Sequence, residues 1–170
     1  MIKGPIHKVF LLISFLLVTS LVFGQMSNYK SLYLYNFIKR IEWPIAATDQ
    51  DFVIIILGDN ETAMAVQQIA NTKKAGERSM EVISAKETTD IITADLIYVS
   101  FSKRKYIEEL VNWIGDQPIL LVSDYKNAEL TDINLVETSD GLEFIIRPEK
   151  IREKGLKLSD MLILLGQQEE

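Results

Sequence analysis

Few side-chain types in this chain could do chemistry. It has no cysteine and a single histidine, His7, so thiol nucleophiles, disulfides and cysteine-ligated zinc are excluded. The main candidates are carboxylates, and Asp59, Asp95 and Asp124 all flank apolar runs. The carboxyl ends of parallel strands share one edge of a sheet, where these three side chains could hold a hard cation such as Mg²⁺. Polar residues at strand ends are nevertheless ordinary, and we predict no metal site.

The only histidine lies in a segment that has the features of a signal peptide. Lys3 and Lys8 precede an apolar run at residues 9–22. This run is too short to span a membrane, because a spanning helix needs about 20 apolar residues. We expect cleavage after Gly24, with an uncleaved N-terminal anchor as the alternative. The mature chain would then lack both cysteine and histidine, which excludes the usual nucleophile–base pairs. We therefore predict a protein that is not an enzyme and uses no cofactor.

Charge narrows the class of partner. The full chain has a net charge of −6, and removal of residues 1–24 takes away two lysines and no acid, which gives −8. Nucleic-acid binding depends on lysine and arginine neutralising phosphates, so a nucleic-acid partner is not expected. Anionic membrane surfaces are disfavoured for the same reason. Residues 25–170 are of the size of one domain.

Apolar runs and helical patterns alternate along the mature chain. Residues 52–57, 96–99 and 119–122 are continuous apolar runs typical of strands buried on both faces. Residues 61–71 and 105–114 between them have helical spacing, and we expect Trp113 in the second helix to pack on the sheet. Asp140-Gly141 predicts a hairpin between two further short strands. The expected fold is α/β, Rossmann-like with three layers: a mostly parallel sheet, an antiparallel C-terminal hairpin and helices on both faces.

Two segments leave a functional and a structural interpretation open. The expected helix at residues 29–41 is rich in aromatic side chains, which could stack on a ligand or simply pack on the sheet. The charged turn at residues 73–78 carries three basic side chains, which could meet an anionic partner or simply be solvated. The aromatic residues are Tyr29, Tyr33, Tyr35, Phe37 and, just beyond the helix, Trp43; the basic residues are Lys73, Lys74 and Arg78.

The C-terminal part combines an apolar stripe with charges of alternating sign. Ser159 is placed to cap a short helix at residues 160–165, whose apolar side chains could enter the core or dock on a partner. Residues 148–154 form the preceding predicted helix. The candidate partner surface consists of Arg147, Glu149, Lys150, Arg152, Met161 and Leu162; the expected helix stripe consists of Leu158, Met161, Leu162 and Leu165.

Several motifs together resemble the YfiR family of small periplasmic proteins. The most specific are YLYNFIKRIEWP at residues 33–44 and DGLEFII at 140–146 followed by GLKLSDML at 155–162; IIILGD at 54–59 and ILLVSD at 119–124 agree with them. The resemblance implies a Rossmann-like fold, export to the periplasm and a regulatory role without catalysis. The best-known member represses a membrane diguanylate cyclase and so limits cyclic di-GMP, while others accompany sensor kinases or outer-membrane proteins.

The resemblance therefore implies a regulator that binds the periplasmic part of a membrane sensor, with a homodimer left open and no membrane insertion after cleavage. Two departures limit the transfer. Control by cysteine oxidation cannot apply to a chain without cysteine, and Arg147-Pro148 stands where the family often has asparagine. The alternative function is a periplasmic small-molecule binding protein whose cleft lies at the carboxyl ends of the strands.

Overall fold

The computed structural model describes residues 25–44, 50–125, 129–139 and 141–169. The predicted signal peptide at residues 1–24 and its cleavage site therefore lie outside the described residues. Asp140 of the predicted hairpin turn lies outside them as well.

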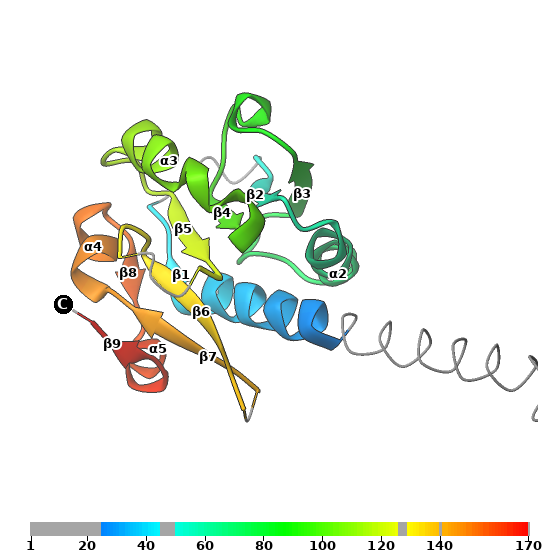
Figure 1. The fold of residues 1–170 in the computed structure, drawn as a ribbon. Coiled ribbons are helices and arrows are strands. Elements are labelled where there is room, and N and C mark those ends of the chain that lie inside the picture. Colours follow the sequence, from blue (N-terminus) through cyan, green and yellow to red (C-terminus); the bar gives the residue numbers. More distant parts are fainter. Residues whose placement is uncertain (1–24, 45–49, 126–128, 140, 170) are drawn as a thin grey trace, which may run out of the picture.

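A seven-stranded sheet forms the centre of the molecule (Figure 1). Neighbouring strands from β3 to β6 are parallel, β6 and β7 form an antiparallel pair, and β9 adds to β7 in parallel. The mostly parallel sheet and its antiparallel hairpin are thus as predicted. In spatial order the strands are β3 (Met80–Ala85), β2 (Phe52–Leu57), β4 (Leu96–Val99), β5 (Leu120–Ser123), β6 (Ile133–Thr138), β7 (Gly141–Ile146) and β9 (Gln167–Gln168).

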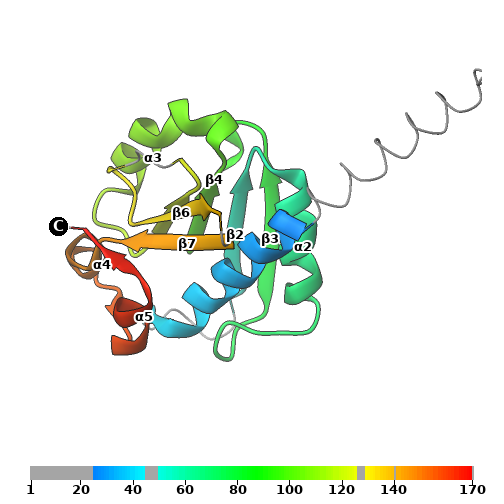
Figure 2. The same ribbon diagram turned by 60° about the horizontal axis from the view of Figure 1, so that its bottom comes forward.

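Helices cover both faces of the sheet and complete the three layers (Figure 2). The N-terminal helix, residues 25–40, lies on one face together with α2 (Asn60–Ala70), α4 (Pro148–Glu153) and α5 (Asp160–Leu165). The other face is covered by α3 (Ile107–Ile114). The strand β2 shows why a continuous apolar run is needed: Phe52, Ile54 and Ile56 face the first layer, and the residues between them face the second.

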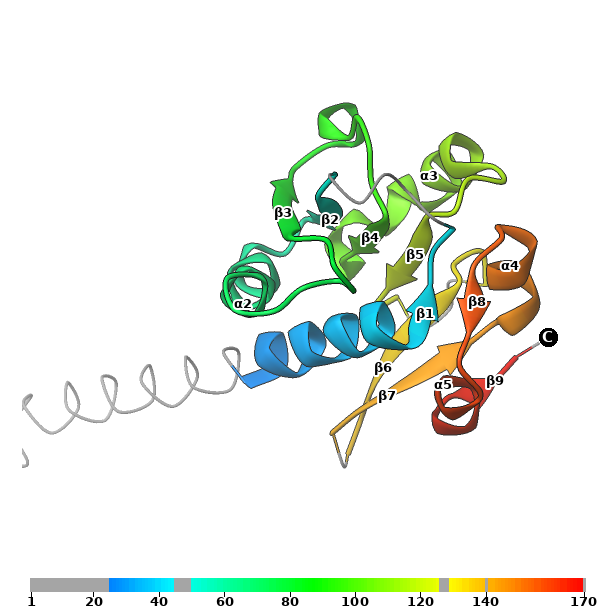
Figure 3. The same ribbon diagram turned by 180° about the vertical axis from the view of Figure 1, so that it is seen from behind.

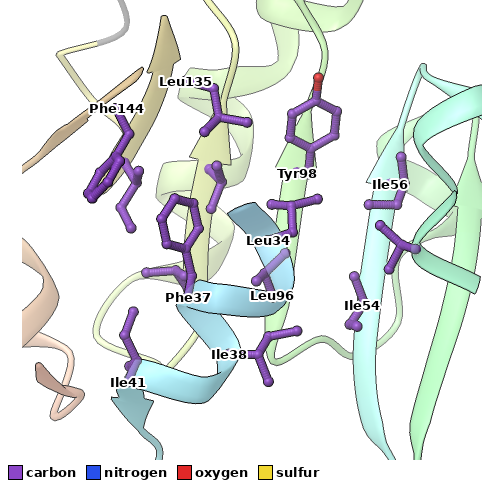
Figure 4. Close-up of a cluster of buried hydrophobic side chains, with 14 of the residues drawn as sticks. Leu34, Phe37, Ile38, Ile41, Ile54, Ile56, Leu96, Tyr98, Leu135 and Phe144 are labelled. Carbon is purple, nitrogen blue, oxygen red and sulfur yellow. The ribbon is translucent and has the colours of Figure 1, made fainter. Parts of the chain in front are cut away.

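The N-terminal helix supplies much of the larger core. Leu34, Phe37, Ile38 and Ile41 point at β2, β4 and the β6–β7 hairpin (Figure 4). Phe37 and Phe144 make an edge-on ring contact with centroids 5.2 Å apart, and the Tyr33 hydroxyl donates to the carbonyl of Leu142 at 2.5 Å. For Tyr33 and Phe37 the structural interpretation of the aromatic stripe therefore holds.

A second, two-stranded sheet joins the two ends of the domain. β1 (Ile41–Glu42) pairs with β8 (Lys157–Leu158) in antiparallel fashion beyond the end of the N-terminal helix (Figure 3). The Ser159 amide also donates to the carbonyl of Arg40 at 2.9 Å. This pairing fixes the start of α5 against the helix.

Two expectations for the α3 region were wrong. Residues 101–106 form a 3₁₀ helix before α3, which begins at Ile107 rather than Lys105. Trp113 is 38% exposed instead of packed on the sheet. The buried side of α3 carries Ile107, Leu110 and Ile114, and Trp113, one position before Ile114, is turned about 100° away. Among the described residues, no helix has the length and apolar character needed to cross a membrane.

Candidate functional site

Local sequence signals place α4 and α5 at the end of the domain. Pro148 occupies the first turn of α4, where its fixed φ is favourable. Gly155 follows α4 with φ +76°, a conformation that glycine adopts without strain. The Ser159 hydroxyl caps α5 as predicted by accepting from the Leu162 amide at 3.3 Å.

Arg147 does not lie on the surface, although we expected it there. Its side chain turns inward and is 4% exposed. One guanidinium nitrogen donates to the Thr131 carbonyl at 3.0 Å and to Asn134 Oδ1 at 2.5 Å, and the other pairs with Glu169. A buried guanidinium needs such partners because desolvation penalises an unpaired charge. Arg147 therefore holds β9 and the start of β6 together.

The other charged candidates surround a cavity beside Arg147. Glu149 and Arg152 form an ion pair on the outer side of α4, and Lys150 donates to the Glu129 carbonyl. The cavity has a volume of about 400 Å³. Its lining residues are Arg147, Pro148, Glu149, Lys150, Arg152, Ile163, Gln168 and Glu169. The structure thus brings the four charged candidates together, but Met161 and Leu162 do not line this cavity.

Three of the five apolar side chains of α5 are exposed. Only Leu162 enters the core, at 1% exposure, so its assignment to the partner surface was wrong. Met161, Leu164 and Leu165 are 52%, 77% and 59% exposed; we call these three residues the α5 patch. The predicted core stripe was therefore wrong for Met161 and Leu165. A helix of six residues beside a two-stranded sheet offers one fully inward position. Ile163 is half-buried, and the other three apolar side chains face outward.

Gly166 seats the segment after α5 on the hairpin. A Cβ atom there would lie 2.5 Å from the Phe144 ring and 2.7 Å from Ile146 Cγ2. Atoms that close would clash, so the close approach requires glycine. Together with the Arg147–Glu169 pair, this contact fixes α5 and β9 on β7.

The carboxyl edge of the parallel strands does not bring the three aspartates together. Asp59 and Asp124 do meet there, but Asp95 precedes β4 and pairs with Arg78 at the opposite edge. Lys30 of the N-terminal helix lies between the first two, with Nζ 2.6 Å from Asp124 and 3.6 Å from Asp59. No group of three metal-ligating side chains occurs in the described part of the chain. Asp59 also caps α2, accepting from the Thr62 amide at 2.9 Å.

Tyr98 completes the arrangement at this edge. Its hydroxyl donates to Asp124 Oδ2 at 2.7 Å. Burial, followed by the negative charge of Asp124, raises the pKa of the Tyr98 phenol. The strand order of the sheet reverses between the neighbours β2 and β4, and α/β proteins usually bind ligands at the carboxyl edge of such a point. Here the side chains of Ser100 and Lys103 lie so near Gly58 that a Cβ atom on Gly58 would be 2.3 Å from Lys103 Cγ. They fill the space at this point, where a small-molecule binding protein, our alternative function, was expected to have its cleft.

One buried charged pair had no signal in the sequence. Asp132 is 1% exposed and pairs with Lys154 at 2.7 Å, while accepting from the Leu121 amide at 2.7 Å. Burial raises the pKa of the Asp132 carboxyl, and Lys154 acts in the opposite direction. The pair ties α4 to the start of β6, and neither residue belongs to a recognisable motif.

The architecture places the chain among the Rossmann-like three-layer α/β proteins. The family model described as YfiR/HmsC-like matches residues 27–167. The match spans most of the chain, so this protein belongs to the YfiR/HmsC-like family, as the sequence motifs predicted. The family is regulatory rather than catalytic. No curated protein matches the chain.

Proposed function

We propose that this protein is an exported regulator without catalytic activity. It binds the periplasmic part of a membrane sensor, a diguanylate cyclase or a sensor kinase, and modulates its signalling. Membership of the YfiR/HmsC-like family supports this role. The absence of cysteine and the position of the only histidine, His7, in the predicted signal peptide agree with it.

The observation that carries the proposal is the α5 patch. Met161, Leu164 and Leu165 lie exposed on one short helix that is held rigidly by the Ser159 cap and by Gly166. Clustered exposed apolar side chains mark interaction surfaces, and apolar anchors contribute most of the affinity of an interface. The charges of α4 tune the association rate. Arg147 is not part of this surface.

A pull-down tests the proposal. The bait is the periplasmic part of a membrane sensor encoded next to this protein. Leu164→Glu, with a carboxylate at the most exposed position of the α5 patch, is expected to abolish capture. Ile92→Glu is the matched control, since Ile92 is also a highly exposed apolar residue, before β4. Normal capture by a folded Leu164→Glu variant would contradict the α5 patch as the interface.

A second copy of the chain is the other candidate occupant of the α5 patch. Light scattering of the purified protein distinguishes the two. A dimer that Leu164→Glu converts to a monomer would assign the patch to self-association, whereas a monomeric wild-type protein leaves the patch free for the sensor.

Export is tested separately. The intact mass of protein from the periplasm should correspond to a chain that starts at Gln25. A chain that retains Met1 would contradict the predicted cleavage.

A small-molecule binding protein remains the second candidate function, because the molecule contains a cavity of about 610 Å³. It lies at the amino edge of the sheet rather than at the carboxyl edge, where we had expected it. Ligand-dependent shifts in the melting temperature without any protein partner would favour this second function.

A further inference from the structure

The largest of the cavities described lies where the N-terminal helix, β1 and the start of β2 meet the turn at residues 74–78. Its volume of about 610 Å³ is in the range of small-molecule sites. We call it the amino-edge cavity. Its lining combines aromatic rings with charged side chains, and the residues used below are Tyr35, Lys39, Trp43, Phe52, Lys74, Glu77 and Arg78.

Arg78 holds the wall of this cavity in place. Its guanidinium makes two parallel hydrogen bonds to Asp95, at 3.0 and 2.8 Å. It also donates to the carbonyls of Gln50 and Asp51, at 2.9 and 2.6 Å. Paired bonds of this kind fix geometry as well as charge. Arg78 is therefore neutralised, and the turn that carries Lys74 and Glu77 is positioned before any ligand arrives.

The aromatic walls are positioned by the same cluster. The Trp43 indole nitrogen donates to the Asp95 carbonyl at 3.2 Å, and its ring meets Phe52 edge-on with centroids 4.8 Å apart. Phe52 is buried and also lies under the Arg78 guanidinium, at 5.1 Å. Trp43 and Tyr35 are only partly buried. These two rings are the ones available to a ligand.

The charges that remain unpaired define the polarity of the ligand. Lys39 and Lys74 make no ion pair within the described part of the chain, and neither does Glu77. Lys39 lies 5.9 Å from the centroid of the Tyr35 ring. Glu42 also lines the cavity, and its carboxylate pairs with Lys157 at 3.8 Å. Apart from this pair, two unpaired cations and one unpaired anion leave an excess of one positive charge, which a single carboxylate would balance.

We infer that the amino-edge cavity binds a monoanionic aromatic carboxylate, with its ring against Tyr35 and Trp43 and its carboxylate at Lys39 and Lys74. This inference goes beyond the proposed regulatory function and does not rest on it. It assigns a role to Tyr35 and Trp43 of the aromatic segment and to Lys74 of the basic turn. Offset or edge-on stacking favours a flat ring over a saturated one.

Fluorescence titration provides the test. In Trp113→Phe, Trp43 is the only tryptophan left, so its emission reports on the cavity. Phenylacetate is the probe, compared with cyclohexylacetate, 2-phenylethanol and 2-phenylethylamine. We expect saturable quenching by phenylacetate and binding at least about tenfold weaker for the saturated, neutral and cationic analogues. No saturable binding of phenylacetate at millimolar concentration would overturn the inference.

Charge variants test the position of the carboxylate. Lys39→Gln and Lys74→Gln should each weaken phenylacetate binding about tenfold, because each removes a charged hydrogen-bond donor. Lys73→Gln is the matched control: it removes the same charge one residue away, and Lys73 lines a neighbouring groove instead. Equal weakening in all three variants would indicate a general charge effect and overturn the assigned site. Unchanged melting temperatures confirm that each variant is folded.

Discussion

Lys30 Nζ lies 2.6 Å from Asp124 Oδ2 and joins residues 94 positions apart in the sequence. The two side chains are 10% and 11% exposed, so the pair is nearly buried. It fastens the N-terminal helix to the segment that follows β5. A lysine ammonium therefore lies between Asp59 and Asp124, two of the three aspartates that we considered as metal ligands and rejected.

Replacing Lys30 should test how much this pair stabilises the fold. Loss of one partner from a buried ion pair leaves an uncompensated charge and costs about 3–5 kcal/mol. Lys30→Met should therefore lower the melting temperature by roughly 10 °C, while exposed Lys39→Met should change it little. Adding Asp124→Asn to Lys30→Met should recover part of the loss. A Lys30→Met variant as stable as the wild type would show that the pair contributes nothing.

Tyr98 gives the protein a defined response to alkaline pH. Its raised pKa means that the folded state keeps the phenol protonated, whereas tyrosine in the unfolded chain loses its proton near pH 10. The contribution to stability is thus complete below about pH 10 and is lost as the pH rises further. Tyr98→Phe has no such proton to lose, so its melting temperature should fall less steeply at alkaline pH.

Tyr29→Phe is the control for that comparison, because the Tyr29 side chain is exposed. Its melting temperature should fall with alkaline pH as steeply as that of the wild type. Curves for Tyr98→Phe and the wild type that stay parallel would contradict the role of Tyr98.

The buried position of Arg147 predicts loss of stability rather than a mild effect on binding. Arg147→Glu would place a carboxylate beside Asn134 Oδ1 and the Thr131 carbonyl, with Glu169 nearby. We expect a loss of about 3 kcal/mol or more. Arg152→Glu reverses the same charge on the exposed side of α4 and should cost at most about 1 kcal/mol. Urea unfolding of both variants checks this, and equal stabilities would contradict it.

Phe144 is the central contact between the hairpin, the N-terminal helix and Gly166. Its ring meets Tyr33 and Phe37 edge-on, with centroids 5.8 and 5.2 Å away. Phe144→Ala should cost about 3–5 kcal/mol, and most of the variant should be degraded or insoluble. The neighbouring Glu143 is exposed, so Glu143→Ala should stay within about 0.5 kcal/mol of the wild type. Thermal melts that show no difference between the two variants would rule out this role of Phe144.

The fold was predictable from the sequence because each central strand is a short, continuous apolar run. Phe52–Leu57 can be recognised from its own residues, because a strand that is covered on both faces is apolar at every position. The Ser159 cap and the Asp59 cap are equally local signals. Trp113 was misplaced although the helical period was right: Ile107, Leu110 and Ile114 take the inward side of α3, and Trp113 is turned about 100° away from it.

The candidate site was less predictable because it depends on contacts between distant residues. Nothing near Arg147 in the sequence shows that Glu169 and Asn134 will surround it. The exposure of α5 likewise depends on how few neighbours a six-residue helix has at the end of the domain. Asp95 was assigned to the wrong edge of the sheet, although its position before β4 could have placed it at the amino end.

The most direct test of the α5 patch measures binding of the neighbouring sensor's periplasmic part by calorimetry, with Leu164→Glu, Ile92→Glu and the wild type compared side by side. We expect that Leu164→Glu loses detectable binding while its circular dichroism and melting temperature match the wild type, and that Ile92→Glu binds normally. Undiminished binding by folded Leu164→Glu would contradict the claim that this protein recognises its partner through the α5 patch.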